Sequence, residues 1–328
     1  MKLALILAGI MIALCATPAR AWDDQGHMMV AAVAWEKLNP AVKKRAIELL
    51  KVNPDYETFI AGVPSELQDQ VAFVRAATWP DMIKKDSRYT NDGDDNSVPN
   101  SSLNIGYRDN LQHRYWHFID LPFSTDGSPL IDPKPPNAET RIELFRQTIA
   151  SNTATDDVKS YDLVWLLHLV GDVHQPLHDT SRFSHDLPGG DHGGNLVTLC
   201  EKPCRDELHA FWDDVLGKST SAIASINAAR RLPQAPPDDS ADADVLAWVN
   251  EGFAIAKESV YSPPIGDGRG PMARRRSFLD ARGEVLPRER KFLDYAFPPT
   301  HVALEVVTNT GGRVGWHNSP LPGPLFPW

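Results

Sequence analysis

The stretch LVWLLHLVGDVHQPLH, residues 163 to 178, decides how this chain folds. It belongs to residues 157–175, where apolar side chains recur at the spacing of a helix. His168 and Asp172 are four residues apart, so on a helix they lie on one face. An imidazole and a carboxylate placed in this way can bind one metal ion.

The end of this helix is predicted from a proline. Pro176 should end or bend the helix, which would turn His178 back toward the site of Asp172. His174 points to the opposite face and is interpreted as a structural residue.

Helical patterns dominate the rest of the chain, and alternating strand patterns are scarce. We therefore predict a mainly α, single-domain fold with long loops over residues 22–328. The remaining predicted helices are residues 23–38, 40–50, 66–85, 139–151, 206–217 and 241–261.

Residues 1–21 have the features of a secretory signal peptide. Lys2 supplies the positive charge, residues 3–16 a short apolar segment, and Ala19-Arg20-Ala21 the cleavage site. The apolar run is short of the ~20 residues that a membrane span needs. We expect a secreted or periplasmic monomer without stable membrane association, beginning at Trp22. A lipoprotein anchored at Cys15 is the alternative.

The chain is acidic, with 33 basic and 43 acidic side chains and a net charge of −10. Loss of Lys2 and Arg20 with the signal peptide leaves 31 basic against 43 acidic side chains, a net charge of −12. Such a chain is poor at binding polyanions through a diffuse basic surface. A nucleic-acid substrate would need a local source of positive charge.

Two cysteines, Cys200 and Cys204, remain after removal of the signal peptide. In an oxidising compartment an even pair favours a disulfide bond. A thiolate pair bound to a metal is the alternative, although the sequence has no partner C-x-x-C pair.

Further histidines and aspartates extend the candidate metal site. The sequence ELHAFWDD repeats the four-residue spacing of histidine and aspartate. Each pair taken alone is weak evidence for a metal site, because a histidine and an aspartate four residues apart more often form a contact on the surface of a helix. A lone histidine among aromatic residues, such as His117, is usually a core residue. Imidazole and carboxylate ligands together are typical of zinc sites. Two or three zinc ions clustered in one site can cleave phosphate esters. The eight candidate side chains are His27, Asp81, His117, His168, Asp172, His178, His209 and Asp213.

These motifs resemble the zinc-dependent single-strand-specific nucleases of the S1/P1 type, a family related in fold to bacterial zinc phospholipases C. The resemblance covers most of the mature chain. It rests on WDDQGH, WPD, HFID, LLHLVGDVHQPLH, GGDHGGN, LHAFWD and, more weakly, WVNEGFAIAKESVY.

The resemblance implies three zinc ions and the ligands of each. Trp22 would bind through the free α-amino group that signal removal creates and through its carbonyl oxygen. Asp172 would bridge the first and third ions. The first ion would be bound by Asp81, His117, His168 and Asp172, the second by His178, His209 and Asp213, and the third by Trp22, His27 and Asp172.

The resemblance also implies hydrolysis of single-stranded RNA and DNA to 5′-nucleotides, with 3′-nucleotidase activity. Asp120 would orient or deprotonate the attacking water, and a nearby cation would stabilise the phosphate. Phe118 would stack on an unpaired base, and Asn195 would contact it. Lys84 stands where the family commonly has arginine, so this chain presents a point charge in place of a bidentate fork.

Two other functions remain open from the residues. A zinc phospholipase C shares the GD…QP.H pattern but typically ends its ligand set with glutamate, where this chain has Asp213. An exported, non-enzymatic zinc-binding protein is the second alternative. The final twenty residues are given no function.

Overall fold

The computed structural model describes residues 22–94, 103–199, 207–232, 244–262 and 265. The predicted signal peptide, the Cys200–Cys204 pair and the C-terminal stretch from residue 266 lie outside the described residues. Within the described ranges, no helix has both the length and the apolar character that crossing a membrane requires.

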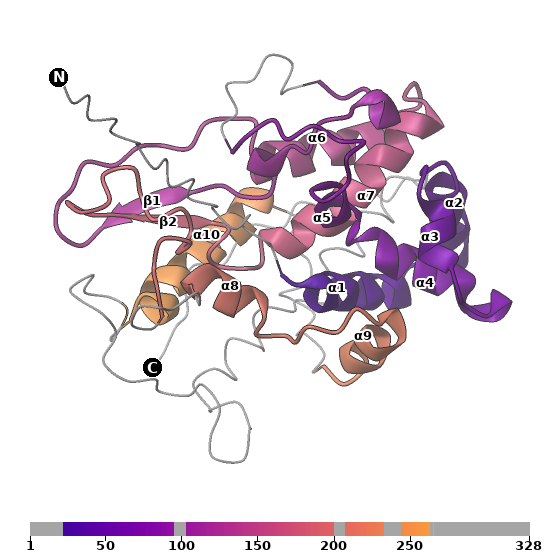
Figure 1. Cartoon of the computed structure of the whole chain (residues 1–328). Coiled ribbons are helices and arrows are strands. Elements are labelled where there is room, and N and C mark those ends of the chain that lie inside the picture. The colour runs from indigo at the N-terminus through magenta and orange to yellow at the C-terminus, as the bar shows by residue number, and fades with distance from the viewer. Residues whose placement is uncertain (1–21, 95–102, 200–206, 233–243, 263–264, 266–328) are drawn as a thin grey trace, which may run out of the picture.

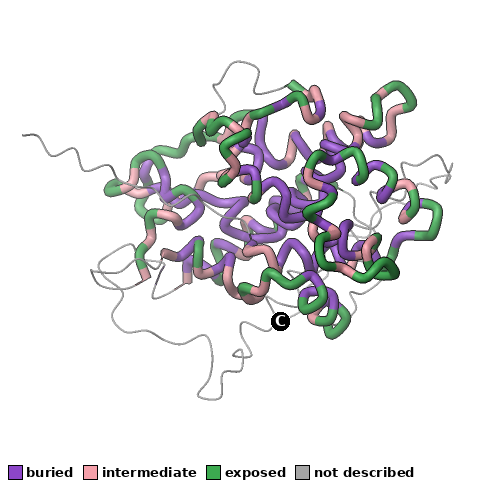
Figure 2. The backbone as a smooth tube through the Cα atoms, turned by 45° about the vertical axis from the view of Figure 1, so that its right-hand side comes forward, coloured by how far each residue is buried: buried purple, intermediate pink, exposed green. Residues whose placement is uncertain are grey.

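Helix α7 (Asp156–Asp172) runs through the middle of the molecule (Figure 1). Every residue from Ser160 to its last residue is buried, and Figure 2 shows the buried chain gathered at the centre. A helix with apolar residues on all sides is stable only when other elements surround it. The elements that pack on it include α1 (Asp24–Lys37), α2 (Pro40–Leu50), α5 (Trp79–Ile83), α6 (Ala138–Ala150) and η2 (Gly106–Arg108).

The remaining elements are short and cover this centre. The helices are α3 (Tyr56–Ile60), η1 (Ser65–Leu67), α4 (Gln68–Ala76), η3 (Arg114–Trp116), α8 (Leu208–Asp213), α9 (Ala222–Ala229), α10 (Val245–Ile255) and the π-helical η4 (Ala256–Val260). The strands are β1 (Leu121–Ser124) and β2 (Thr180–Phe183). The mainly α prediction is confirmed.

The predicted helix 206–217 is too long, because α8 ends at Asp213, and two other predicted helix boundaries are also wrong. Residues 66–85 do not form one helix, because α4 ends at Ala76 and α5 begins at Trp79. Pro80 lies in the first turn of α5, where its missing N–H costs no hydrogen bond, so it starts a helix. Helix α7 ends at Asp172, well before Pro176.

The parallel strands β1 and β2, which pair Leu121 with Thr180, were not predicted from the sequence. The pairing continues backward from the strands: Ile119 N donates to His178 O at 2.8 Å, and Leu121 N donates to Asp179 O at 3.1 Å. The segment that carries His117 is thereby fixed beside the segment that carries His178.

A buried histidine anchors the chain that leads into this segment. His113 adopts a left-handed backbone, with φ 47°, and its ring stacks on Trp116 at 3.6 Å between centroids. Its Nε2 lies 3.0 Å from Asp109 Oδ2, and its Nδ1 lies 3.2 Å from Asp92 Oδ2. Burial disfavours the charged ring, yet the two aspartates outweigh it and raise the pKa of His113.

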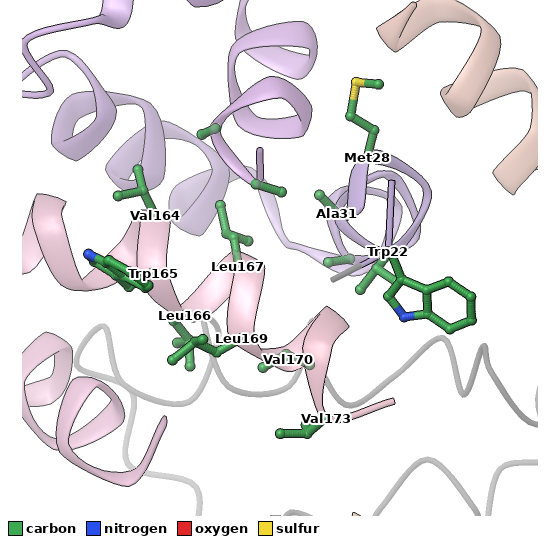
Figure 3. Packing of buried hydrophobic residues seen from close by; sticks show 14 of the residues in the cluster. Trp22, Met28, Ala31, Val164, Trp165, Leu166, Leu167, Leu169, Val170 and Val173 are labelled. Carbon is green, nitrogen blue, oxygen red and sulfur yellow. The ribbon is translucent and has the colours of Figure 1, made fainter. Parts of the chain in front are cut away.

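Trp22 is fully buried between α1 and α7, as Figure 3 shows. Its indole Nε1 donates to Gly171 O at 2.8 Å, and the next residue, Asp23, donates its backbone N–H to Asp213 O at 3.1 Å. A Cβ at Gly26 would lie 2.7 Å from Trp22 Cβ, so glycine is needed there. The start of the described chain therefore lies against both α7 and α8.

Candidate metal centre

The fold brings all eight predicted histidine and aspartate ligands into three groups, two of which overlap. Within each group the ligand atoms lie within 4.8 Å of one another. His168 belongs to two groups. The groups are His27, Asp81 and His168; His117, His168 and Asp172; and His178, His209 and Asp213.

Asp172 joins the first two groups through its two oxygens. Oδ2 lies 3.0 Å from His117 Nδ1 and 3.3 Å from His168 Nε2. Oδ1 lies 3.4 Å from His27 Nε2. A carboxylate whose oxygens face different imidazoles can bridge two metal ions.

Backbone carbonyls orient three of the imidazoles. A hydrogen bond from one ring nitrogen to a carbonyl fixes the tautomer and directs the other nitrogen toward a metal. The sequence pattern could not reveal these acceptors, because they come from remote turns. The pairs are His168 Nδ1 with Ala77 O at 2.7 Å, His178 Nδ1 with His117 O at 2.6 Å, and His209 Nδ1 with Gly193 O at 2.7 Å.

The third group depends on a residue that the sequence analysis missed. Gln175 is fully buried, and its Nε2 donates to Asp213 Oδ1 at 2.8 Å. Its Oε1 accepts from Leu177 N at 2.7 Å, which fixes the orientation of the amide. Asp213 Oδ2 then lies 3.6 Å from His209 Nε2. The position of Gln175 beside Pro176, between two histidines, was the available signal.

Several buried polar atoms of the centre have no hydrogen-bond partner among the described residues. They are His27 Nδ1 and Nε2, Asp81 Oδ1, His117 Nε2, Asp172 Oδ1, His178 Nε2 and Asp213 Oδ2. Each such buried group costs about 1–3 kcal/mol if nothing satisfies it. Imidazole nitrogens and carboxylate oxygens together are the donor set of zinc and similar ions. The residues therefore fit a site for such cations.

Burial controls the ionisation of the centre. It lowers the pKa of His27, His117 and His178 well below the usual value, and that of His168 to about 4. The imidazoles are therefore neutral at pH 7, with lone pairs available for a metal. Burial raises the pKa of Asp172 and Asp213 well above the usual range. A bound cation would favour their ionised forms.

A buried lysine lies at the edge of the first group. Lys84 Nζ is 2.7 Å from Asp81 Oδ1, and the lysine side chain is only 5% exposed. Burial opposes ionisation of Asp81, yet Lys84 and the neighbouring histidines lower its pKa. The lysine that was predicted to face phosphate therefore lies beside a predicted metal ligand.

Asp120 lies outside the three groups, directly before β1. Burial and then the charge of Asp191 raise its pKa to about 7. Phe118 follows His117 and is partly buried against the core. Asn195 lies two residues after Gly193, whose carbonyl binds His209, and its side-chain amide donates to His192 O at 2.6 Å. All three thus flank the metal groups along the backbone.

Comparison with known proteins gives a consistent match. Residues 22–281 match the family model described as S1/P1 nuclease. The chain is 25% identical over 220 residues to Endonuclease 1 of Arabidopsis thaliana, covering 64% of this chain and 58% of that protein. It is 21% identical over 232 residues to Nuclease P1 of Penicillium citrinum, covering 70% of this chain and 72% of that protein. The match to Nuclease PA3 of Penicillium sp is 22% over 192 residues, 58% of this chain and 57% of that protein.

Proposed function

The chain belongs to the S1/P1 nuclease family, and from this premise we propose that it is a phosphodiesterase that binds three zinc ions. We propose that the mature protein is a secreted or periplasmic monomer with one domain, residues 22–328. It hydrolyses single-stranded RNA and DNA to 5′-nucleotides and also acts as a 3′-nucleotidase. The observation that carries the proposal is that two of the three His and Asp groups meet at Asp172, whose oxygens face His117 and His27.

The zinc ligands are proposed as three sets, two of which share Asp172. Zinc bound there would lower the pKa of a water molecule and neutralise phosphoryl oxygens. The two oxygens of Asp172, which face different imidazoles, support its role in two of the sets. The sets are Asp81, His117, His168 and Asp172; His178, His209 and Asp213; and Trp22, His27 and Asp172.

The α-amino group and carbonyl oxygen of Trp22 complete the third set in this proposal. The indole of Trp22 is fixed to α7 through Gly171, and Asp23 is fixed to α8 through Asp213. The backbone at this point therefore lies between two ligand-bearing helices. Removal of a preceding signal peptide would create the amine, whose pKa near ~7.7–8 allows a metal to displace its proton under mild conditions.

Four further residues are proposed to act on the substrate. Asp120 accepts a proton from the attacking water, which its pKa of about 7 permits at neutral pH. The ammonium group of Lys84 attracts a phosphate oxygen. Phe118 stacks on an unpaired base, and Asn195 contacts that base; because stacking needs an exposed base face, single strands are preferred.

The test uses mature protein that begins at Trp22. We expect about three zinc ions per chain by elemental analysis, because each of the three binding sets would hold one ion. We also expect the protein to cleave single-stranded oligonucleotides, and this activity should be abolished by EDTA and restored by zinc. A matched protein with one methionine before Trp22 should lose most activity and one zinc ion. Zinc-replete protein that leaves oligonucleotides intact would refute the proposal, and cleavage of phosphatidylcholine alone would assign the centre to phospholipase chemistry.

A further inference from the structure

A glycine-rich loop beside the centre is folded around one buried carboxylate. Gly190, His192, Gly193 and Gly194 all have positive φ, between 53° and 84°. Asp191 lies among them and is fully buried. A left-handed backbone is unfavourable for residues other than glycine, so a loop of this shape needs hydrogen bonds that hold it in place.

The first oxygen of Asp191 joins the end of the loop to strand β2. Oδ1 accepts the backbone N–H of Arg182 in β2 at 2.9 Å and that of Gly194 at 3.2 Å. The backbone oxygen of Asp191 also accepts from Leu196 N at 3.1 Å. Asp191 therefore ties the loop to the strand that follows His178.

The second oxygen of Asp191 connects the loop to the chain after α10. Oδ2 accepts the hydroxyl of Tyr261 at 2.8 Å and lies 3.6 Å from Arg182 Nε. The guanidinium of Arg182 lies over the Tyr261 ring at 4.8 Å, and Phe123 packs on that ring at 5.1 Å. The Tyr261 ring would keep both contacts without its hydroxyl.

The loop reaches the metal centre at Gly193. Its carbonyl accepts the Nδ1–H of His209 at 2.7 Å, which directs Nε2 toward Asp213. A Cβ at Gly193 would lie 2.3 Å from Leu177 O and 3.2 Å from His209 Nδ1, so no side chain fits. The position of this carbonyl follows directly from the folding of the loop around Asp191.

We infer that Asp191 and Tyr261 are positioning residues for His209, and that they act through the Gly193 carbonyl on the group formed by His178, His209 and Asp213. The inference rests on the proposed zinc centre. Loss of the partner that orients a metal-bound imidazole typically weakens metal affinity 10- to 100-fold. The weakening should therefore affect one ion and leave the ions near Asp172 unchanged.

The experiment compares Tyr261→Phe, Asp191→Asn and the parent, each as zinc-loaded mature protein. Tyr107→Phe is the matched control, because its hydroxyl bonds Ser160 at 3.0 Å, near the start of α7 and away from the end that carries Asp172. Zinc is removed stepwise with a chelator of known affinity, and bound zinc is counted by elemental analysis. Thermal unfolding of the metal-free proteins measures general destabilisation.

We expect Tyr261→Phe to release one zinc ion at 10- to 100-fold higher free zinc than the parent, with the others retained. Tyr107→Phe should release its zinc as the parent does. Equal release curves for Tyr261→Phe and the parent would overturn the inference, as would equal weakening of every ion in step with the loss of thermal stability. If Asp191→Asn does not fold, Tyr261→Phe alone decides. A parent that binds zinc but cleaves no oligonucleotide would refute the proposed function, and the release curves would still test the positioning role.

Discussion

Replacing Gly171 with alanine tests whether the close contact between α1 and α7 is needed to position His27. Gly171 lies one residue before Asp172, near the end of α7. A Cβ there would lie 2.7 Å from His27 Nδ1 and 3.2 Å from its Cε1. The His27 ring cannot move freely, since it stacks on His168 with centroids 3.8 Å apart.

Two opposing effects set the size of the stability change. Alanine is favoured over glycine in a helix by about 0.8–1 kcal/mol. Overpacking a core typically costs about 1–3 kcal/mol. The free energy of unfolding should therefore fall by about 0–2 kcal/mol, so Gly171→Ala remains folded. Displacement of His27 by a few tenths of an ångström should nevertheless weaken binding of the zinc ion that His27 and Asp172 are proposed to share.

The assay combines denaturant unfolding of the metal-free protein with zinc analysis and cleavage of single-stranded oligonucleotides. Gly189→Ala is the control, because its Cβ would meet nothing within 4 Å. The control should match the parent in zinc content and be equally or slightly more stable. A Gly171→Ala protein with raised stability and full zinc content would refute the reasoning, because the His27 contact would then tolerate a methyl group.

Three further predictions concern single side chains. Asp120→Asn should lower the cleavage rate about 10²–10⁴-fold with unchanged zinc content. The rate of the parent should fall as pH falls through the pKa of Asp120, which is about 7 in the metal-free chain. If the variant showed the same fall in rate at low pH, Asp120 would not be the group that accepts the proton. Gln175→Leu removes the amide that donates to Asp213 and should weaken one zinc ion about 10- to 100-fold, as chelator competition would measure. Because the pKa of His113 is raised, its ion pairs should stabilise the fold fully below pH ~6.5 and less as pH rises through the raised value. His113→Gln should therefore be about 3–5 kcal/mol less stable at pH 6 by urea unfolding, and an equal deficit at pH 9 would count against the charged pair.

The ligand pairs on helices could be predicted from sequence because they depend only on local geometry. His168 and Asp172 lie four residues apart in α7, and His209 and Asp213 lie four apart in α8, so helical periodicity alone places each pair on one face. Prediction failed where the chain leaves regular structure. The end of α7 was expected near Pro176, yet the helix ends at Asp172.

The supporting contacts could not be predicted, because each depends on segments far apart in the sequence. The carbonyl that orients His209 belongs to Gly193, in a loop whose shape depends on Asp191. The parallel pairing that sets His117 beside His178 involves strands too short to show an alternating pattern. A sequence reports which residue types can bind a metal, whereas their orientation is fixed by the tertiary fold.

The buried centre also explains how an acidic protein can act on a polyanion in the proposed function. Asp81, Asp172 and Asp213 contribute at most three negative charges, whereas three zinc ions contribute six positive ones, so a loaded centre would be positive by about three. The proposed mature chain would carry a net charge of −12 over its whole length, and this charge is screened beyond about 8–10 Å at physiological salt. Attraction therefore acts only on a phosphate that comes close to the buried groups. In the proposed function an unpaired strand could bend to bring a phosphate there, whereas a stiff duplex could not, so affinity should depend on metal loading more than on net charge.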